Sequence, residues 1–188
     1  MNFFRMLAYS ASDGSAPSVN FKSHNKHRSD SQRVEYMSSI TVRQAVFSDV
    51  GELSGLFDLY RVFQGKESNI EAARSFLQAR FDHGESVVFM AHEGSAPLGF
   101  AQIYPSYSST ALARVFILND LFVHENGRRK GVASKLLAAL EGYAWAHGAA
   151  RVTLNVAIDN RPGRELYEAQ GWRKDEQFFM YHSYPGRH

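Results

Sequence analysis

Residues Leu118–Leu140 read LNDLFVHENGRRKGVASKLLAAL and contain three patterns in direct succession. The apolar run Leu118–Val123 has the composition of a buried strand. A polar turn over residues 124–127 follows, and then a basic segment with a glycine, Arg128–Ala133. Beyond it, up to a stop near Gly148, apolar residues recur at the spacing of an amphipathic helix, namely Val132, Leu136, Leu140 and Tyr143. The stretch therefore predicts a strand, a basic turn and a helix.

This order of elements is typical of an anion-binding site. Free backbone N–H groups and the positive end of the helix dipole converge where the helix begins, and a glycine lets a phosphate come close. Three cations beside that point, Arg128, Arg129 and Lys130, suit a pyrophosphate. Two familiar phosphate loops do not fit, because the Walker pattern needs two glycines before Lys-Ser/Thr and the dinucleotide fingerprint needs three. The alternative is a solvated basic turn that caps an ordinary helix.

The composition describes one domain and excludes several kinds of site. A chain of 188 residues with 44% hydrophobic residues can bury one core, and no apolar run approaches the ~20 residues of a membrane span. The absence of cysteine excludes disulfides, thiolate metal ligands and a cysteine nucleophile, and it fits the reducing cytoplasm, where we expect the protein to act. The net charge of +2 does not indicate nucleic acid, and the eight histidines lack ligand spacing, so we expect no metal site.

Residues 1–38 differ from the rest of the chain. Ser, Asn, Asp, Lys and His dominate residues 10–39 with little apolar periodicity, so we expect a disordered or loosely attached extension before a domain over residues 39–188. The basic residues of this segment are spread out, which favours a solvated tail over a nucleic-acid patch. Met37 directly precedes the folded pattern and is a candidate for an alternative or true start of the protein.

The remaining sequence alternates between strand and helix patterns. Apolar runs and alternating residues predict six strands, at residues 40–45, 86–92, 98–104, 112–123, 151–156 and 178–182. Helical stripes predict four helices, which begin near Asp49, Ser68, Val132 and Asn160. Residues 105–110 are expected to form a loop. The order β-α-α-β-β-β-α-β-α-β indicates an α/β protein with a mixed central sheet and helices on both faces.

Two motifs make the chain similar to the GNAT N-acetyltransferase superfamily. The acetyl-CoA loop of that family, Gln/Arg-x-x-Gly-x-Gly/Ala, is matched by Arg128, Gly131 and Ala133. Residues 160–172, NRPGRELYEAQGW, resemble the family segment Asn-x-x-Ala-x-x-Leu/Phe-Tyr…Gly-Phe/Trp, with Gly163 where alanine is usual. The expected order of elements is also that of the family, and the resemblance covers residues 40–182. It implies the GNAT (acyl-CoA N-acyltransferase) fold.

The resemblance further implies that acetyl-CoA and an amine bind together and that the amine attacks the thioester directly. It assigns the binding of acetyl-CoA to the strand end and the basic loop, namely Leu121, Phe122, Val123, Arg128, Arg129, Lys130, Gly131, Val132, Ala133 and Ser134. Asn155 and Asn160 are further candidates for contacts with the pantetheine amides or the adenylate, although Asn160 is also expected to cap a helix. Tyr167 lies at the family's position for the acid that protonates or hydrogen-bonds the departing thiolate. Its alternative role is that of a core aromatic whose hydroxyl reaches the surface.

The general base is less well defined. The polyamine branch of the family has Glu-Asp before Phe-Phe-Val, whereas this chain has Asn119-Asp120 before Leu-Phe-Val. Asn119 cannot usefully accept a proton, so Asp120 is the candidate, either as a base, directly or through a water, or as a group that orients an ammonium. Asp120 could instead be a structural carboxylate. Aromatic residues on segments that wall the acceptor side in this family would suit a cationic amine, namely Tyr60, Phe63, Tyr104 and Tyr107.

The sequence therefore predicts an acetyl-CoA-dependent N-acetyltransferase that acts on a primary amine. The acceptor is expected to be a small-molecule amine or a basic peptide tail, because the motifs look most like the branch that acetylates polyamines, small amines or basic protein tails. The second hypothesis is a GNAT module that binds acyl-CoA without turnover, as a ligand sensor or regulator, and it is motivated by Asn119. No nucleic-acid or membrane partner is expected. Members of the family commonly dimerise, so a homodimer is expected.

Overall fold

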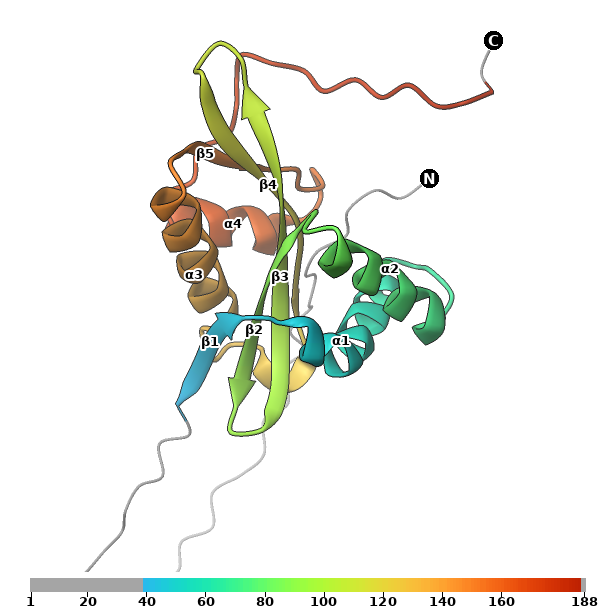
Figure 1. Cartoon of the computed structure of the whole chain (residues 1–188). Coiled ribbons are helices and arrows are strands. Elements are labelled where there is room, and N and C mark those ends of the chain that lie inside the picture. The colour runs from blue at the N-terminus through green and yellow to red at the C-terminus, as the bar shows by residue number, and fades with distance from the viewer. Residues whose placement is uncertain (1–38, 187–188) are drawn as a thin grey trace, which may run out of the picture.

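A five-stranded sheet runs through the middle of the computed structural model, which describes residues 39–186 (Figure 1). Its strands lie in chain order, β1 (Ile40–Gln44), β2 (Val87–Glu93), β3 (Ala96–Ser108), β4 (Ala113–Val123) and β5 (Ala149–Leu154). β1 to β4 are antiparallel to their neighbours, whereas β4 and β5 are parallel because a helix connects them. The predicted mixed sheet is confirmed. The extension expected over residues 1–38 and the candidate start at Met37 lie outside the described residues.

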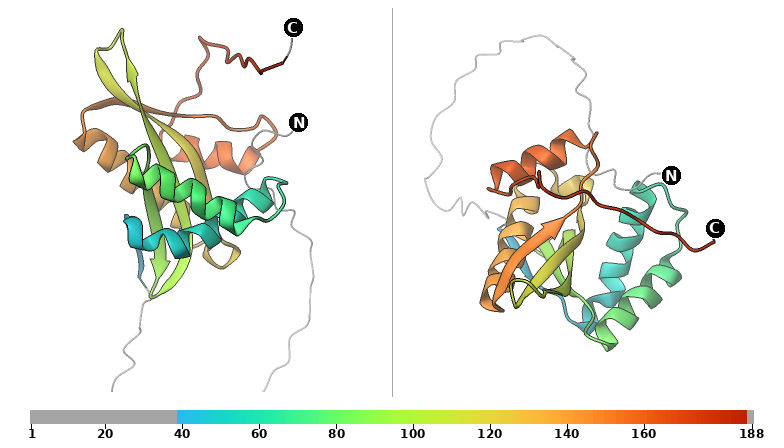
Figure 2. Two further views of the ribbon diagram at one scale, coloured as in Figure 1. Left: turned by 45° about the vertical axis from the view of Figure 1, so that its right-hand side comes forward. Right: turned by 90° about the horizontal axis from the view of Figure 1, so that it is seen from above.

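Helices cover both faces of the sheet, as predicted (Figures 1 and 2). α1 (Val50–Phe63) and α2 (Ile70–Asp82) lie on one face, and α3 (Val132–Ala146) and α4 (Arg161–Ala169) lie on the other. Two short 3-10 helices, η1 (Phe47–Asp49) and η2 (Glu125–Gly127), lead into α1 and follow β4. Each face has its own apolar core, so the sheet is buried on both sides. None of the helices within residues 39–186 is long and apolar enough to cross a bilayer.

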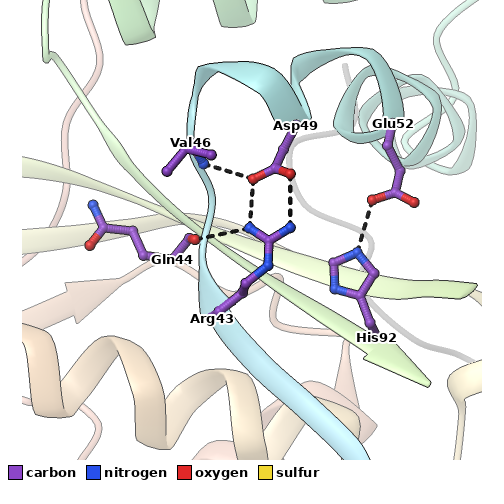
Figure 3. A network of polar contacts seen from close by, with 6 residues as sticks. All are labelled: Arg43, Gln44, Val46, Asp49, Glu52 and His92. Atoms are coloured by element: carbon purple, nitrogen blue, oxygen red, sulfur yellow. Dashed lines mark hydrogen bonds and ion pairs between the residues drawn. The ribbon is translucent and has the colours of Figure 1, made fainter. Parts of the chain in front are cut away.

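A network of hydrogen bonds and ion pairs connects β1 to the start of α1 (Figure 3). The predicted helix begins directly after Asp49, but the carboxylate of Asp49 points back toward β1. It accepts two hydrogen bonds from Arg43, at 2.6 and 2.8 Å, and one from the N–H of Val46 at 2.8 Å. These hydrogen bonds, with that of Arg43 first, lower the pKa of Asp49 to about 2. Glu52, in the first turn of α1, contacts Nε2 of His92 at 2.8 Å.

The predicted loop at residues 105–110 is wrong for its first four residues. β3 continues to Ser108, which lies opposite Ala113 of β4. The neighbouring strand β2 begins at Val87, opposite Ile103, and does not extend alongside Pro105, which therefore lies where β3 is an edge strand. A proline is tolerated there because no strand on that side needs its missing N–H. The upper halves of β3 and β4 therefore project from the sheet as a long hairpin (Figure 1).

The predicted cap of α2 is wrong by one residue. The side chain of Asn69, not Ser68, accepts a hydrogen bond from the N–H of Ala72 at 2.9 Å. The hydroxyl of Ser68 donates to Asp58 on α1 at 2.6 Å and ties the helix connection to the preceding helix. Local sequence allows either residue to be the cap; the contact with Asp58 decides between them.

The predicted strand at residues 178–182 is also wrong. In the described part of the chain, no strand follows α4, and residues 178–181 are exposed. This segment leaves the body of the fold in the views of Figures 1 and 2. An apolar run forms a strand only when a partner strand satisfies its backbone groups, and this copy of the chain places none beside it.

Candidate active site

The parallel strands β4 and β5 separate before β4 ends, next to the residues that the sequence analysis predicts to bind acetyl-CoA. β4 pairs with β5 from Arg114 to Leu118, which lies opposite Leu154. β4 then continues for five more residues to Val123, and in the described part of the chain no β5 residue pairs with them. Backbone groups on that side of β4 are therefore available to a ligand. The predicted residues Leu121, Phe122 and Val123 lie here with their side chains buried, so only their main chain can contribute.

A bulge in β4 accompanies this separation. Gln102 of β3 lies opposite Asp120, while the next residue, Ile103, lies opposite Leu118, so Asn119 is an extra residue in β4. An extra residue reverses the alternation of side chains beyond it. The side chain of Asp120 is consequently placed on the α1 side of the sheet, while Leu121 returns to the core beneath α3.

The predicted anion loop connects this strand end to α3. Arg129 and Gly131 both have left-handed backbone conformations, with φ of 59° and 77°. Alternation of this kind turns successive N–H groups toward one side, which is a common way to bind an anion. No side chain caps α3 at Gly131, and no acidic residue lies in its first turn. The N–H groups of Val132, Ala133 and Ser134 and the positive end of the helix dipole are therefore uncompensated by a protein carboxylate.

The three cations of this loop have different surroundings. The ammonium of Lys130 pairs with Glu93 at the end of β2, at 2.9 Å. Nε of Arg128 lies 3.5 Å from the carbonyl oxygen of Val123, a long contact that spans the turn. Arg129 is exposed. Of the three expected cations, Lys130 thus faces the β2–β3 hairpin and already has a carboxylate partner.

Two glycines that the sequence analysis did not single out hold the strand end in place. A Cβ on Gly99 of β3 would lie 2.4 Å from the carbonyl oxygen of Phe122. A Cβ on Gly127 would lie 3.0–3.1 Å from Leu98 and Val123. Gly99 requires glycine because the backbone of β4 approaches too closely for any side chain, whereas a Cβ on Gly127 fits only if Leu98 and Val123 shift by a few tenths of an ångström. Nothing in the local sequence pattern distinguishes these glycines from turn glycines.

The candidate base is a buried carboxylate. Asp120 is 6% exposed, and burial raises its pKa, while hydrogen bonds from Asn119 and Tyr60 act in the opposite direction. Nδ2 of Asn119 donates to Oδ2 of Asp120 at 3.1 Å. Burial, and next the charge of Asp120, raise the pKa of Tyr104 to about 12 and also raise that of Tyr60. Two of the expected acceptor-side tyrosines therefore lie beside Asp120, which is surrounded by side chains of β4, β3 and α1.

A buried amide lies opposite Asp120 and was not predicted. Gln102 is fully buried, and its Nε2 donates to the hydroxyl of Ser86 at 2.7 Å. Its Oε1 is among the buried atoms of the described residues without a hydrogen-bond partner. A glutamine inside the apolar run of β3 is the sequence signal that could have identified this polar pair.

Tyr167, the candidate acid, is 7% exposed on α4 and belongs to the core beneath α3. Its ring lies 5.7 Å from that of Trp172. Burial raises the pKa of its hydroxyl, so the group is protonated at neutral pH. After burial and Asp120, Tyr167 makes a smaller contribution to the raised pKa of Tyr60. Tyr167 and Asp120 thus lie on opposite faces of the sheet.

Asn160 caps α4, as predicted. Its Oδ1 accepts a hydrogen bond from the N–H of Gly163 at 3.0 Å, and a Cβ on Gly163 would lie only 2.7 Å from its Nδ2. Glycine in place of the usual alanine therefore leaves room for the amide. Nδ2 of Asn160 is buried without a hydrogen-bond partner among the described residues, so it remains available as a donor. Asn155 lies directly after β5 and is exposed at the separation of the strands.

Metal ligands do not gather at this site. Within residues 39–186, no group of three or more His, Asp or Glu side chains is arranged to hold a metal ion. The chemistry available here is that of one buried carboxylate, tyrosine hydroxyls, backbone N–H groups and a basic loop.

Comparison with known proteins identifies the fold and the class of relatives. The model of the acetyltransferase (GNAT) family matches residues 53–172. The uncharacterized N-acetyltransferase YhfO of Bacillus subtilis is 41% identical over 142 residues, which are 76% of this chain and 95% of that protein. A probable acetyltransferase of Haemophilus influenzae is 29% identical over 63% of this chain and 80% of its own length. The crystal structure of a probable acetyltransferase has a TM-score of 0.74 at 37% identity and covers 79% of this chain and 99% of its own. The predicted fold is thereby confirmed.

Proposed function

Because the chain belongs to the GNAT family of acetyltransferases, we propose that it transfers an acetyl group from acetyl-CoA to a primary amine by direct attack in a ternary complex. The observation that carries this proposal is the separation of β4 from β5 after Leu118, next to the uncapped start of α3. An extended arm can add to the open edge of β4 while its phosphates lie at the helix N-terminus.

The binding roles follow from what each segment offers. The main chain of Leu121–Val123 bonds the pantetheine amides, and a backbone N–H there stabilises the thioester oxygen as negative charge develops. Residues Arg128–Ser134 bind the pyrophosphate, mainly through backbone N–H groups and with charge from Arg128 and Arg129. Asn155 and the free Nδ2 of Asn160 are donors for the pantetheine arm. A solved neighbour, an aminoglycoside N-acetyltransferase in complex with CoA, has the same fold at 20% identity and a TM-score of 0.68, with 80% of this chain and 98% of that chain covered.

The chemical step requires a proton acceptor and a partner for the thiolate. An aliphatic amine has a pKa of ~10, so most of it is protonated at neutral pH. Asp120 accepts the proton, directly or through a water, and burial makes it a stronger base than an exposed aspartate. The amine nitrogen then bonds the thioester carbon, and the C–S bond breaks. Tyr167 donates a hydrogen bond to the departing sulfur; its raised pKa makes a hydrogen bond more favourable than complete proton transfer, because a thiol has a pKa of only ~8.5.

The acceptor is proposed to be a small-molecule amine or a basic peptide tail. Asp120 with the hydroxyls of Tyr60 and Tyr104 forms an acceptor-rich, aromatic surrounding that suits an ammonium group. Structural neighbours below 25% identity include aminoglycoside acetyltransferases and a ribosomal-protein-alanine N-acetyltransferase. They share the fold alone, and both small and protein amines occur among their named acceptors.

One observation favours a second function, a module that binds acyl-CoA without turnover. Asn119 occupies the position of the glutamate found in the polyamine branch, and it donates a hydrogen bond to Asp120. In that case the Asp120 carboxylate is structural, and acetyl-CoA is a regulatory ligand.

A single experiment distinguishes the enzyme from the module that binds acyl-CoA without turnover. Acetyl-CoA is titrated into the protein by calorimetry, and thiol release is then measured with polyamines, amino acids and a basic peptide. The enzyme requires binding followed by release with at least one amine, whereas binding without release across the panel supports the module. Tyr167→Phe and Asp120→Asn should each lower kcat by ~10²-fold or more while acetyl-CoA still binds. Asp82 is exposed, so the variant Asp82→Asn is the matched control and should retain full activity.

The pH profile tests the base separately. If Asp120 is the base, kcat/KM falls on the acid side of a pKa above the ordinary 3.8, because burial raises the pKa of that carboxyl. Asp120→Asn should remove this limb from whatever activity remains. An unchanged limb in Asp120→Asn would assign the base to another group.

A further inference from the structure

Gln102 is a buried polar residue that the proposed mechanism leaves without a role. It is fully buried in the middle of β3, and its Oε1 has no hydrogen-bond partner among the described residues. A buried amide oxygen costs stability unless a donor reaches it. A group that donates to this oxygen during the reaction would account for a glutamine inside an apolar strand.

Strand geometry places this amide beside Asp120. Gln102 and Asp120 are direct partners in the antiparallel pair of β3 and β4, as are Phe100 and Phe122 two residues further along. Both phenylalanines belong to the core on the α1 side of the sheet, so the alternation along each strand puts Gln102 and Asp120 on that side too. Directly opposite residues have Cβ atoms ~4.5–5.5 Å apart, which brings an amide and a carboxylate within reach of each other.

Ser86 determines which end of the amide faces Asp120. Nε2 of Gln102 donates to the hydroxyl oxygen of Ser86 at 2.7 Å. Ser86 directly precedes β2, and β3 lies between β2 and β4 in the sheet. The amide nitrogen is therefore turned toward β2. Because the amide oxygen lies on the other side of the same carbon, Oε1 is directed toward β4 and Asp120.

The hydrogen bonds that Asp120 already has favour its ionised form. Nδ2 of Asn119 donates to Oδ2 of Asp120 at 3.1 Å, and Tyr60 of α1 also forms a hydrogen bond with the carboxylate. Both bonds lower the pKa of Asp120 against the larger effect of burial, which raises it. A protonated carboxyl group has an O–H that needs an acceptor instead, and the amide nitrogen of Asn119 cannot accept a hydrogen bond.

Charged side chains act on the neighbouring Tyr104 rather than directly on Asp120. Among the described residues, no side chain with a full charge is among the groups that shift the pKa of Asp120. Arg80, near the end of α2, and Glu85, after that helix, affect the pKa of Tyr104 in opposite directions. The protonation of Asp120 is therefore governed by burial and by neighbouring hydrogen bonds, so one further hydrogen bond changes it measurably.

We propose that Gln102 is a positioning residue for Asp120: its Oε1 accepts a hydrogen bond from the carboxyl group once Asp120 has taken a proton from the amine, and Ser86 holds the amide in that orientation. This inference rests on the proposed transfer to a primary amine. The bond stabilises the neutral carboxyl group, opposes the effect of Asn119 and Tyr60, and makes the carboxylate a stronger base.

The protons of the reaction balance in this scheme. One N–H bond of the ammonium group breaks and an O–H bond forms on Asp120, whose proton then bonds Oε1 of Gln102. The freed lone pair of the nitrogen bonds the thioester carbon, and the C–S bond breaks. The new amide nitrogen loses a second proton, which neutralises the departing thiolate. Asp120 releases its own proton to solvent before the next turnover.

The pKa of Asp120 in the full-length protein tests the hydrogen bond without reference to activity. It is measured from the NMR signal of the Asp120 carboxyl carbon as a function of pH. Gln102→Met keeps a side chain of similar length but removes the amide. The pKa of Asp120 should then fall by about half a pH unit or more, because the neutral form loses its hydrogen bond.

Variants of Ser86 test the orientation of the amide. Ser86→Ala leaves Nε2 of Gln102 without its acceptor, so the amide can turn its N–H groups toward the carboxylate, and the pKa of Asp120 should fall as well. Ser86→Thr keeps the hydroxyl and should restore the wild-type pKa. Ser54→Ala is the matched control, because Ser54 is also buried but bonds the carbonyl oxygen of Val50 within α1, and it should leave the pKa of Asp120 unchanged. If Gln102→Met does not fold, the two Ser86 variants decide the question.

The pH profile of acetyl transfer tests the role in the reaction. In Gln102→Met and Ser86→Ala, the acid limb of kcat/KM should move to lower pH by the same amount as the pKa of Asp120. A weaker base should also lower kcat ~3- to 10-fold, while acetyl-CoA affinity stays at the wild-type value. Loss of packing alone would lower activity without moving the limb.

Four results would overturn the inference. An unchanged pKa of Asp120 in Gln102→Met would show that no hydrogen bond from the neutral carboxyl group was lost, and a higher pKa would show that the amide donates to the carboxylate instead. A lower pKa with an acid limb that stays in place would remove Gln102 from the reaction. A wild-type protein that binds acetyl-CoA but acetylates no amine would refute the proposed function and this role with it, even where the NMR titration shows the hydrogen bond.

Discussion

The close approach of β3 to β4 at Gly99 gives the sharpest test of the site's geometry. Gly99 pairs with Val123, the last residue of β4. A Cβ at this position would lie 2.4 Å from the carbonyl oxygen of Phe122 and 3.2 Å from the Cα of Val123. Both contacts involve backbone, so no side-chain rotation relieves them. Because non-bonded heavy atoms prefer separations of ~3.5–4 Å, Gly99→Ala must push the two strands apart by ~1 Å.

The expected cost can be worked out from this displacement. Overpacking a tightly packed position costs ~1–3 kcal/mol, and the weakened hydrogen bond of the strand pair adds ~0.5–1.5 kcal/mol. The free energy of unfolding should therefore fall by ~2–4 kcal/mol. With a urea m-value of ~2 kcal/mol/M, the midpoint of urea unfolding falls by ~1–2 M. Displacement of Val123 should also remove about one backbone hydrogen bond to acetyl-CoA, which weakens binding ~2- to 10-fold in calorimetry.

The same substitution elsewhere provides the control. Gly142 lies inside α3, and no atom lies within 4 Å of a Cβ added there. Gly142→Ala should stabilise the protein by ~0.5–1 kcal/mol, because alanine loses less backbone entropy in a helix. The urea midpoint then rises by ~0.3–0.5 M, and acetyl-CoA affinity is unchanged. The reasoning fails if Gly99→Ala unfolds at the wild-type urea concentration, or if both variants change in the same direction.

Two further predictions concern single polar side chains. Arg43 lowers the pKa of Asp49 to about 2 in the folded state against an ordinary 3.8, so this carboxylate stabilises the fold above pH ~4 and the contribution is lost as the pH falls toward 2. Asp49→Asn should lower the free energy of unfolding by ~1 kcal/mol at pH 6, and this value is small because the Arg43 side chain is half-exposed. In urea unfolding, the difference in stability between the variant and the wild type should narrow below pH 4. A difference in stability that does not depend on pH would contradict the assignment. Asn160→Asp keeps the oxygen that caps α4 but removes the free Nδ2 donor. The urea midpoint of this variant should remain close to that of the wild type, while acetyl-CoA should bind more weakly. Asn160→Ala should bind acetyl-CoA more weakly and should also lose ~1 kcal/mol of stability. Equal acetyl-CoA affinity in Asn160→Asp and wild type would leave Asn160 as a cap only.

The order of elements could be predicted from the sequence because each element carries its own local signal. The stripes of α1 and α3, the hairpin glycine at residue 94 and the proline after Asn160 need no knowledge of distant residues. Predictions failed where a distant contact decides the outcome. Ser68 bonds Asp58 in place of capping α2, and Pro105 remains in a strand because β2 does not extend alongside it. The exposed segment 178–181 is the same kind of failure, since its strand pattern needs an edge that its own copy does not bring to it.

The position of the Asp120 side chain, by contrast, follows from the spacing of the apolar residues in β4, which the prediction of a continuous strand did not take into account. The apolar residues of β4 that face α3 are Phe116, Leu118, Leu121 and Val123, so their separations are two, three and two residues. A regular strand would keep a separation of two throughout. It would place Asp120 in the apolar core beneath α3 and turn Leu121 and Val123 toward α1. The one extra residue, Asn119, sends the carboxylate to the side of Tyr60 and Tyr104 and returns the apolar side chains to the core. It also lies where pairing with β5 stops, so the same irregularity that opens the backbone of β4 to a ligand sets the candidate base beside it.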